Sequence, residues 1–253
     1  MDPIVARAAA NCAGAYREWA ARTGHRTALW PDLSVADQGV PNSAPVDSAC
    51  LLAPAQDTEA MADVVDRAEA VFARSEGGPV QIWSAWPTPD LTARGYTPYQ
   101  VPWRMRPADR PQPPTPEGLR IQAARDEHDL RSAALLIDAV FGVGARDPSG
   151  LVTADLIDDD LEVFVGYVEE RAVATATAYV SDGFCGVYAV ATAPEARGRG
   201  YGEALSWAAT LFRADLPATL QASPMGYPIY SRMGFRTYGE FALWEGPRPR
   251  RAG

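Results

Sequence analysis

Apolar residues at helical and strand spacings predict a series of short elements in the second half of the chain. Residues 126–142 begin with acidic capping residues and carry apolar residues at helical spacing, which predicts an amphipathic helix. Residues 119–124 before it have the composition of a strand. Residues 162–192 alternate or run apolar, with polar breaks at 169–171 and 181–183. The breaks predict hairpin turns and therefore three antiparallel strands.

Further elements are predicted towards the end of the sequence. A second amphipathic helix follows residue 200, then a strand at 217–223, a short helix at 228–234 and paired strands within 235–246. The predicted order is strand, helix, three strands, helix, strand, helix and two strands. Such an order is typical of an α+β domain.

An internal repeat predicts that the two halves share an architecture. Residues 79–99 resemble residues 218–238, and Gly95 pairs with Gly234 at an offset of 234 − 95 = 139 residues. Each copy follows a predicted amphipathic helix, at 58–74 in the first half. Five prolines fall within 105–118, which predicts a linker. The predicted organisation is an N-terminal domain, a proline-rich linker, a C-terminal domain and a tail, at 1–106, 107–118, 119–246 and 247–253.

The amino-acid composition excludes several classes of function. The 253 residues are 47% hydrophobic and 22% charged, as in ordinary globular proteins. All 23 basic residues are arginine, so neither a P-loop lysine nor a lysine Schiff base is available. A net charge of −9 argues against a nucleic-acid-binding surface and favours a cationic substrate.

Cysteine and histidine usage predicts neither a disulfide framework nor a metal site. The 3 cysteines are an odd number at distant positions, and the 2 histidines give no zinc-binding spacing. The first 23 residues are interrupted by charges, which predicts neither a signal peptide nor a membrane span. We therefore expect a cytoplasmic location.

The glycine-rich stretch "RGRGYG", residues 197–202, follows an apolar run and precedes a predicted helix. Unpaired N–H groups and the positive end of a helix together make an anion site, for which phosphate is the natural guest. Arg197 and Arg199 add positive charge. The glycine spacing differs from the dinucleotide-binding pattern "GxGxxG".

Two motifs resemble those of the GNAT acetyltransferase superfamily. "VYAVATAPEARGRGYGEAL" looks like its motif A, Arg/Gln-x-x-Gly-x-Gly/Ala, matched by Arg197, Gly200 and Gly202. "IYSRMGF", residues 229–235, resembles its closing signature. The resemblance covers about residues 119–246. It implies the GNAT fold, a mixed, mostly antiparallel sheet flanked by helices, here in two tandem GNAT-like domains.

The resemblance also implies a site. The pyrophosphate of acetyl-CoA, the acyl donor, would lie on the glycine turn, and the pantetheine arm would lie where the sheet splays after the fourth strand. Tyr230 matches the tyrosine that protonates the leaving thiolate, with a packing role as the alternative. The implied donor-binding residues are Val190, Ala191, Thr192, Arg197, Gly198, Arg199, Gly200, Tyr201, Gly202 and Glu203.

A general base is harder to assign from sequence. We expect Asp182 to accept the proton of the attacking amine, with Glu169, Glu170 and the acidic residues 158–160 as open alternatives.

The first half departs from the family pattern. It lacks motif A before its helix, and the repeat places Leu91 opposite Tyr230. We interpret it as a degenerate GNAT-like domain that has lost donor binding. Four tryptophans in this half would either line a substrate cleft or pack in the core: Trp30, Trp83, Trp86 and Trp103.

The predicted function is an N-acyltransferase that moves an acetyl group from acetyl-CoA to the amine of a small molecule by direct attack in a ternary complex. Two alternatives stay open: an acyl donor carried by an acyl carrier protein, and a non-catalytic CoA-binding module. The expected partners include neither nucleic acid nor a membrane, and the expected state is a monomer or homodimer. The acceptor is not identified by motif, since acceptor loops carry little sequence signal.

Overall fold

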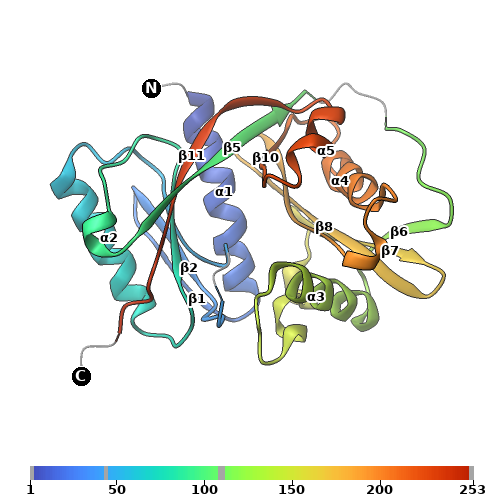
Figure 1. Cartoon of the computed structure of the whole chain (residues 1–253), viewed down its shortest axis with the longest axis horizontal. Helices are drawn as coiled ribbons and strands as arrows, with labels where there is room; N and C mark the ends of the chain where they lie inside the picture. Colours follow the sequence, from blue (N-terminus) through green and yellow to red (C-terminus); the bar gives the residue numbers. More distant parts are fainter. Residues whose placement is uncertain (1–2, 43–44, 108–111, 251–253) are drawn as a thin grey trace. The chain divides into compact units, whose positions relative to one another are not determined.

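The computed structural model describes residues 3–42, 45–107 and 112–250, which form two compact units (Figure 1). Unit 1 is Met1–Trp103 with Gly239–Gly253, and unit 2 is Arg104–Tyr238. Parts of the predicted N-terminal domain, linker and tail lie outside the described residues. The strands β5 (Thr97–Arg106) and β11 (Arg236–Gly246) each run across a boundary between the units.

Unit 1 is built on a mixed sheet in the order β1-β2-β3-β4-β11. The pairs β1–β2, β2–β3 and β4–β11 are antiparallel, and β3–β4 is parallel. A 3-10 turn, η1 (Thr92–Arg94), precedes β5. The other elements are α1 (Pro3–Arg22), β1 (Arg26–Leu29), β2 (Leu33–Asp37), β3 (Asp47–Leu51), α2 (Thr58–Phe72) and β4 (Val80–Ser84).

The two helices of unit 1 pack against opposite faces of its sheet (Figure 1). Every residue of β2, β3 and β4 is buried, which requires cover on both sides. On one face, Cys50 of β3 contacts Cys12 of α1. On the other, Val35 and Ala49 pair across β2 and β3 and join the apolar cluster that α2 covers. Asp57 caps α2 by accepting a hydrogen bond from the Ala60 N–H.

Unit 2 is a sheet in the order β10-β9-β8-β7-β6, with the end of β5 beside β10. Its strands are antiparallel except for the parallel pair β10–β9. Short 3-10 turns η2 (Pro148–Leu151) and η3 (Ala154–Leu156) follow α3, and η4 (Pro194–Ala196) follows β9. The main elements are β6 (Leu119–Ala123), α3 (Glu127–Phe141), β7 (Leu161–Val168), β8 (Arg171–Ser181), β9 (Phe184–Thr192), α4 (Tyr201–Leu211), β10 (Ala218–Gln221) and α5 (Tyr227–Arg232).

The helices α3 and α4 cover opposite faces of the unit 2 sheet (Figure 1). Neighbouring residues of β7 show this directly. A Cβ at Gly166 would lie 2.7 Å from Leu205 of α4, whereas the Tyr167 hydroxyl donates to Asp129 of α3 at 2.7 Å.

Most predicted elements of the second half are confirmed, including the α3 helix, the three-stranded antiparallel meander, α4, β10 and α5. The expectation of two paired strands within 235–246 is wrong. The segment is one strand, β11, because it contains no turn: Gly239 has no left-handed φ, and a Cβ built on it would lie 3.6 Å from the Trp103 ring. Within the described ranges, no helix is both long and apolar enough to cross a bilayer.

The repeat seen in the sequence has a structural counterpart. Gly95 follows η1 with φ of 84°, and Gly234 follows α5 with φ of 90°. In each copy the next residue is a buried aromatic, Tyr96 or Phe235. The two copies therefore end a short helix in the same left-handed turn, which favours glycine.

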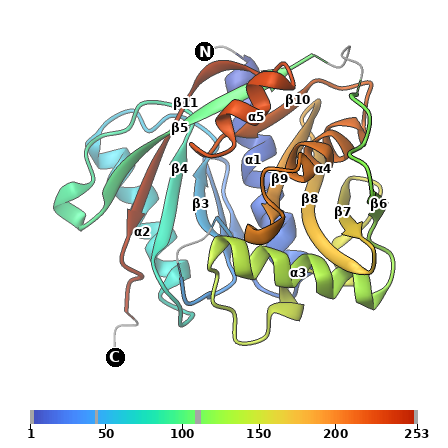
Figure 2. The same ribbon diagram turned by 45° about the vertical axis from the view of Figure 1, so that its right-hand side comes forward.

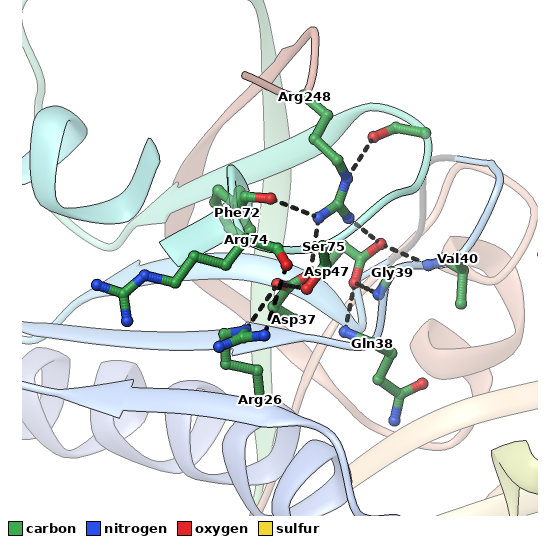
Figure 3. Close-up of polar contacts among 11 residues, drawn as sticks. Arg26, Asp37, Gln38, Gly39, Val40, Asp47, Phe72, Arg74, Ser75 and Arg248 are labelled. Carbon is green, nitrogen blue, oxygen red and sulfur yellow. Dashed lines mark hydrogen bonds and ion pairs between the residues drawn. The ribbon is translucent and has the colours of Figure 1, made fainter. Parts of the chain in front are cut away.

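A buried arginine holds the end of the described chain in unit 1 (Figure 3). The Arg248 guanidinium donates to Asp37 Oδ1 at 2.7 Å and to Asp47 Oδ2 at 2.6 Å, and its other N–H groups reach the carbonyl oxygens of Phe72 and Gly78. Both carboxylates are fully buried. Buried charges of this kind persist only when they are paired and hydrogen-bonded.

Asp47 is the most constrained carboxylate of this cluster. It also accepts hydrogen bonds from the backbone N–H groups of Gln38, Gly39 and Val40 (Figure 3). Burial raises the pKa of Asp47 to about 6, and the Arg248 charge acts in the opposite direction. The folded protein therefore binds more protons at Asp47 than the unfolded chain between pH 3.8 and about 6. The contribution of this group to stability is largest at low pH and falls as the pH rises through about 6.

We predict that Arg248→Met lowers the free energy of unfolding by about 3–5 kcal/mol at pH 7, because two buried carboxylates lose their cation. Removing the guanidinium raises the folded pKa of Asp47 further, so the loss should shrink as the pH falls below 6. Urea unfolding at pH 7.5 and 5.0 measures both effects. The matched control is Arg250→Met, an exposed arginine two residues later. A loss of stability independent of pH would contradict this account.

Candidate functional site

The loop between β9 and α4 presents backbone N–H groups at the start of a helix (Figure 2). Gly198 and Gly200 have φ of 77° and 81°, in the left-handed region. Gly200 is the N-cap of α4 and makes no side-chain capping bond. Within the described residues, the N–H groups of residues 198–203 have no recorded acceptor. A Cβ on Gly198 would meet nothing within 4 Å, whereas a Cβ on Gly200 would lie 3.5 Å from Pro116, so the turn is open beside Gly198.

Charge at this turn is positive. Arg197 and Arg199 are exposed, and Arg197 Nε donates to the Thr192 carbonyl at 3.3 Å. Glu203 in the first turn of α4 accepts two hydrogen bonds from Arg232 of α5, at 2.7 and 3.2 Å. Because Arg232 neutralises this carboxylate, the two turn arginines and the helix dipole determine the local sign.

Gly202 allows α4 to approach the end of β9. A Cβ at this position would lie 2.7 Å from Thr192 Oγ1. The third glycine of the motif is therefore explained by helix–strand packing, whereas the first two are explained by backbone conformation.

β9 contains a bulge in its second half. Thr175 and Thr177 of β8 pair with Ala191 and Tyr188, so two steps along β8 oppose three along β9. Inside the bulge, Ala189 has φ of 47°, which is strained for a residue with a side chain. The predicted residue Val190 follows it and is partly buried.

β9 and β10 pair only at their starts. The recorded partners are Ala218 with Cys185 and Thr219 with Gly186. Beyond Gly186, the edge of β9 that faces β10 has no recorded strand partner in the described chain, and this stretch includes the bulge and the predicted residues Ala191 and Thr192. Residues 190–192 therefore have no strand partner on this side within the described chain, although the Thr192 carbonyl accepts the hydrogen bond from Arg197 Nε.

Tyr230 of α5 is buried in the core of unit 2, with 8% of its surface exposed. Its ring packs edge-on against Phe235 at 5.7 Å between centroids. Burial raises the pKa of Tyr230 to about 12, and a hydrogen bond with the Ser206 hydroxyl acts in the opposite direction. Ser206 lies on α4 and donates to the Gly202 carbonyl at 2.8 Å. The phenol is therefore protonated at neutral pH and lies one helical turn from the glycine turn.

The predicted general base, Asp182, lies just before the start of β9, at the other end of the strand from the glycine turn. It is exposed at the tip of the β8–β9 hairpin, with φ of 52°. Six residues, 183–188, separate it from Ala189, and seven steps at the usual strand rise span roughly 23 Å. Among the alternatives, Glu169 and Glu170 lie in the β7–β8 turn, and residues 158–160 precede β7. A direct role for any of them stays a prediction.

Three of the four tryptophans are core residues of unit 1. Trp83, Trp86 and Trp103 are 5%, 9% and 3% exposed. Trp83 packs against Tyr16, and Phe241 lies edge-on to Trp83 and Trp103. Trp30 is half-buried, with the Arg67 guanidinium over its ring. That these four tryptophans line a substrate cleft stays a prediction. No group of three or more potential metal ligands occurs in the part of the chain that the structure describes.

Residues 131–215 match the family model of the acetyltransferase (GNAT) family. This segment is a GNAT domain. The match includes the bulge of β9 and the glycine turn, and it ends before the Tyr230 helix. No curated protein sequence is significantly similar to the chain.

Solved structures confirm the GNAT fold over nearly the whole chain. A GCN5-related N-acetyltransferase from Kribbella flavida is 19% identical, with a TM-score of 0.68 over 94% of this chain and 95% of that one. A functionally unknown conserved protein from Staphylococcus epidermidis is 11% identical, with a TM-score of 0.62 over 87% and 93%. A GCN5-related N-acetyltransferase from Sphaerobacter thermophilus is 15% identical, with a TM-score of 0.55 over 87% and 77%. The predicted mixed sheet with flanking helices is confirmed.

Three features around the GNAT domain's glycine turn are missed by sequence reasoning. The sequence does not predict the left-handed backbone of Ala189, since alanine does not favour a positive φ. Ser206 looks like an ordinary polar position on a helix. Arg104 donates to carbonyl oxygens at Tyr227 and Phe235, more than 120 residues away in sequence, and such a contact follows only from the fold.

Gly226 is needed for the position of the Tyr230 ring. A Cβ on Gly226 would lie 2.7 Å from Tyr230 Cε2, although the backbone conformation itself (φ −77°) suits any residue. We predict that Gly226→Ala lowers the free energy of unfolding by about 1–3 kcal/mol, because the ring must move within a packed core. Denaturant unfolding of both proteins measures this difference in the free energy of unfolding. The matched control is Gly150→Ala, where the added Cβ meets nothing within 4 Å. Equal effects at the two positions would contradict the steric explanation.

Proposed function

We propose that the chain is an acyl-CoA-dependent N-acyltransferase that moves an acetyl group from acetyl-CoA to the amine of a small molecule, by direct attack in a ternary complex. The observation that carries the proposal is the glycine turn at the N-terminus of α4, which follows a segment of β9, residues 190–192, that has no strand partner on its β10 side within the described chain. The GNAT family match supports acetyltransferase chemistry in general.

The turn fits the pyrophosphate of the donor. Its N–H groups, the positive end of α4 and the Arg197 and Arg199 side chains are all suited to an anion, and the open space beside Gly198 leaves room for one. Gly200, Tyr201, Gly202 and Glu203 would contribute their N–H groups. In this proposal the pantetheine amide groups bond to the free edge of β9 between Val190 and Thr192.

The neutral amine nitrogen attacks the thioester carbonyl carbon, the N–C bond forms, the C–S bond breaks with its electron pair leaving on sulfur, and the nitrogen loses one proton to water or to the general base. Tyr230 is the proposed acid. Because its pKa is about 12, complete proton transfer to a thiolate is uphill, given a usual thiol pKa of about 8.5. Tyr230 therefore stabilises the leaving sulfur by hydrogen bonding as charge develops, and solvent completes the protonation.

Several finer assignments stay predictions: acetyl as the acyl group, free CoA rather than a carrier protein, the base, the degenerate character of the first half, the cytoplasmic location and the oligomeric state. The net charge of −9 favours a cationic acceptor.

We predict that Arg199→Gln weakens acetyl-CoA binding by about tenfold, because one phosphate contact is lost at the N-terminus of α4. Titration calorimetry measures the affinity. Arg213→Gln is the matched control, since Arg213 follows the same helix at its other end and pairs with Asp215. Absence of binding by the unmodified protein would point to a carrier-protein donor or a non-catalytic role. Equal weakening in both variants would refute the proposed phosphate site.

We predict that Tyr230→Phe lowers kcat by about 10²-fold or more and leaves the affinity for acetyl-CoA within threefold, because the hydroxyl acts on the leaving sulfur only as the C–S bond breaks. Amine-dependent thiol release, screened over primary amines, provides the assay. Unchanged turnover in Tyr230→Phe, with full thiol release, would show that the tyrosine serves packing alone.

A further inference from the structure

We infer that Arg104 is a positioning residue for Tyr230, acting by clamping the short helix that carries the tyrosine. This inference rests on the proposed role of Tyr230. It concerns a residue of β5, outside the segment that matches the GNAT family model and before the proline-rich stretch.

The geometry of Arg104 is that of a clamp. One terminal nitrogen donates to the Tyr227 carbonyl at 2.8 Å, and the other donates to the Phe235 carbonyl at 2.5 Å. These two carbonyls lie at the beginning of α5 and just after its end. The fork of a single guanidinium therefore spans the segment that has Tyr230 near its middle.

The guanidinium of Arg104 is buried, and its two terminal nitrogens are hydrogen-bonded whereas its Nε has no partner within the described residues. Arg104 is 3% exposed, and its guanidinium lies 4.1 Å from the centroid of the Tyr227 ring. No carboxylate partner of Arg104 is recorded in the described chain, so the carbonyl oxygens and the ring face hold the charge. The Thr219 hydroxyl reaches the Arg104 carbonyl at 3.5 Å, which ties this part of β5 to β10.

The helix needs such support. α5 has six residues, too few to be stable by its own hydrogen bonds. Besides the hydrogen bond between Tyr230 and Ser206, its polar tie to α4 is the exposed Arg232–Glu203 pair, and exposed pairs contribute little. A small displacement of a group that acts on the reacting atoms costs on the order of a hundredfold in rate, so fixing α5 fixes the tyrosine hydroxyl.

Hydrogen exchange tests the clamp without any assay of transfer. In the full-length protein, Arg104→Met should speed exchange at least about tenfold in the amides of residues 229–235, which include the Phe235 N–H bonded to the Tyr230 carbonyl. Exchange in α4 should stay unchanged. The matched control is Arg106→Met, which removes the next buried arginine of β5, stacked on Trp207 of α4. Unchanged exchange at 229–235, or equal loss in both variants, would overturn the inference.

A double-mutant cycle tests the consequence for Tyr230. Arg104→Met should lower kcat about tenfold to a hundredfold and leave the KM for acetyl-CoA within threefold. In the Tyr230→Phe background it should have no further effect. The lysine of Arg104→Lys reaches one carbonyl only, so the kcat of this variant should lie between those of the unmodified protein and Arg104→Met. Additive losses, or complete rescue by lysine, would overturn the inference. Absence of transfer by the unmodified chain would refute the proposed function alone, and exchange would still decide whether Arg104 fixes α5.

Discussion

The early end of pairing between β9 and β10 is the constraint on which the candidate site depends. A strand inside a sheet satisfies its backbone on both edges, whereas β9 does so only up to Gly186 on the side of β10. The bulge at Ala189 shifts the register of the remaining residues, which still pair with β8, at the cost of a left-handed alanine. The unpaired edge is followed by the hydrogen-bonded turn η4 and then by the glycine turn, so two nearby segments of main chain would bind a ligand that has amide groups at one end and phosphates at the other.

The tyrosine and the turn are linked through α4. Ser206 donates to the Gly202 carbonyl in the first turn and is hydrogen-bonded to Tyr230. The helix that would bind the anion therefore also fixes the hydroxyl. This arrangement explains why a phenol with a pKa raised by burial is compatible with a role in catalysis: its proton is held in place at every physiological pH, and only its position has to be controlled.

Periodicity and turn residues predict the elements of unit 2 well, since α3 has an Asp126 cap and a Gly142 stop, and the β7–β9 breaks contain residues that tolerate a positive φ. The motif around Arg197 and Gly200 likewise predicts the turn. The failures have a common cause. The single strand β11, the strained Ala189 and the reach of Arg104 all depend on partners distant in sequence, to which local patterns do not respond.

The absence of lysine has a structural consequence as well as a chemical one. At Arg248, one guanidinium meets two carboxylates and two carbonyl oxygens, and at Arg104 the two terminal nitrogens reach carbonyls eight residues apart. A lysine has a single nitrogen and would leave some of these acceptors unpaired inside the protein, where each would cost about 1–3 kcal/mol. At both positions arginine is therefore required for the number and planar arrangement of its N–H donors. Another cationic side chain with the same charge would not satisfy the same acceptors.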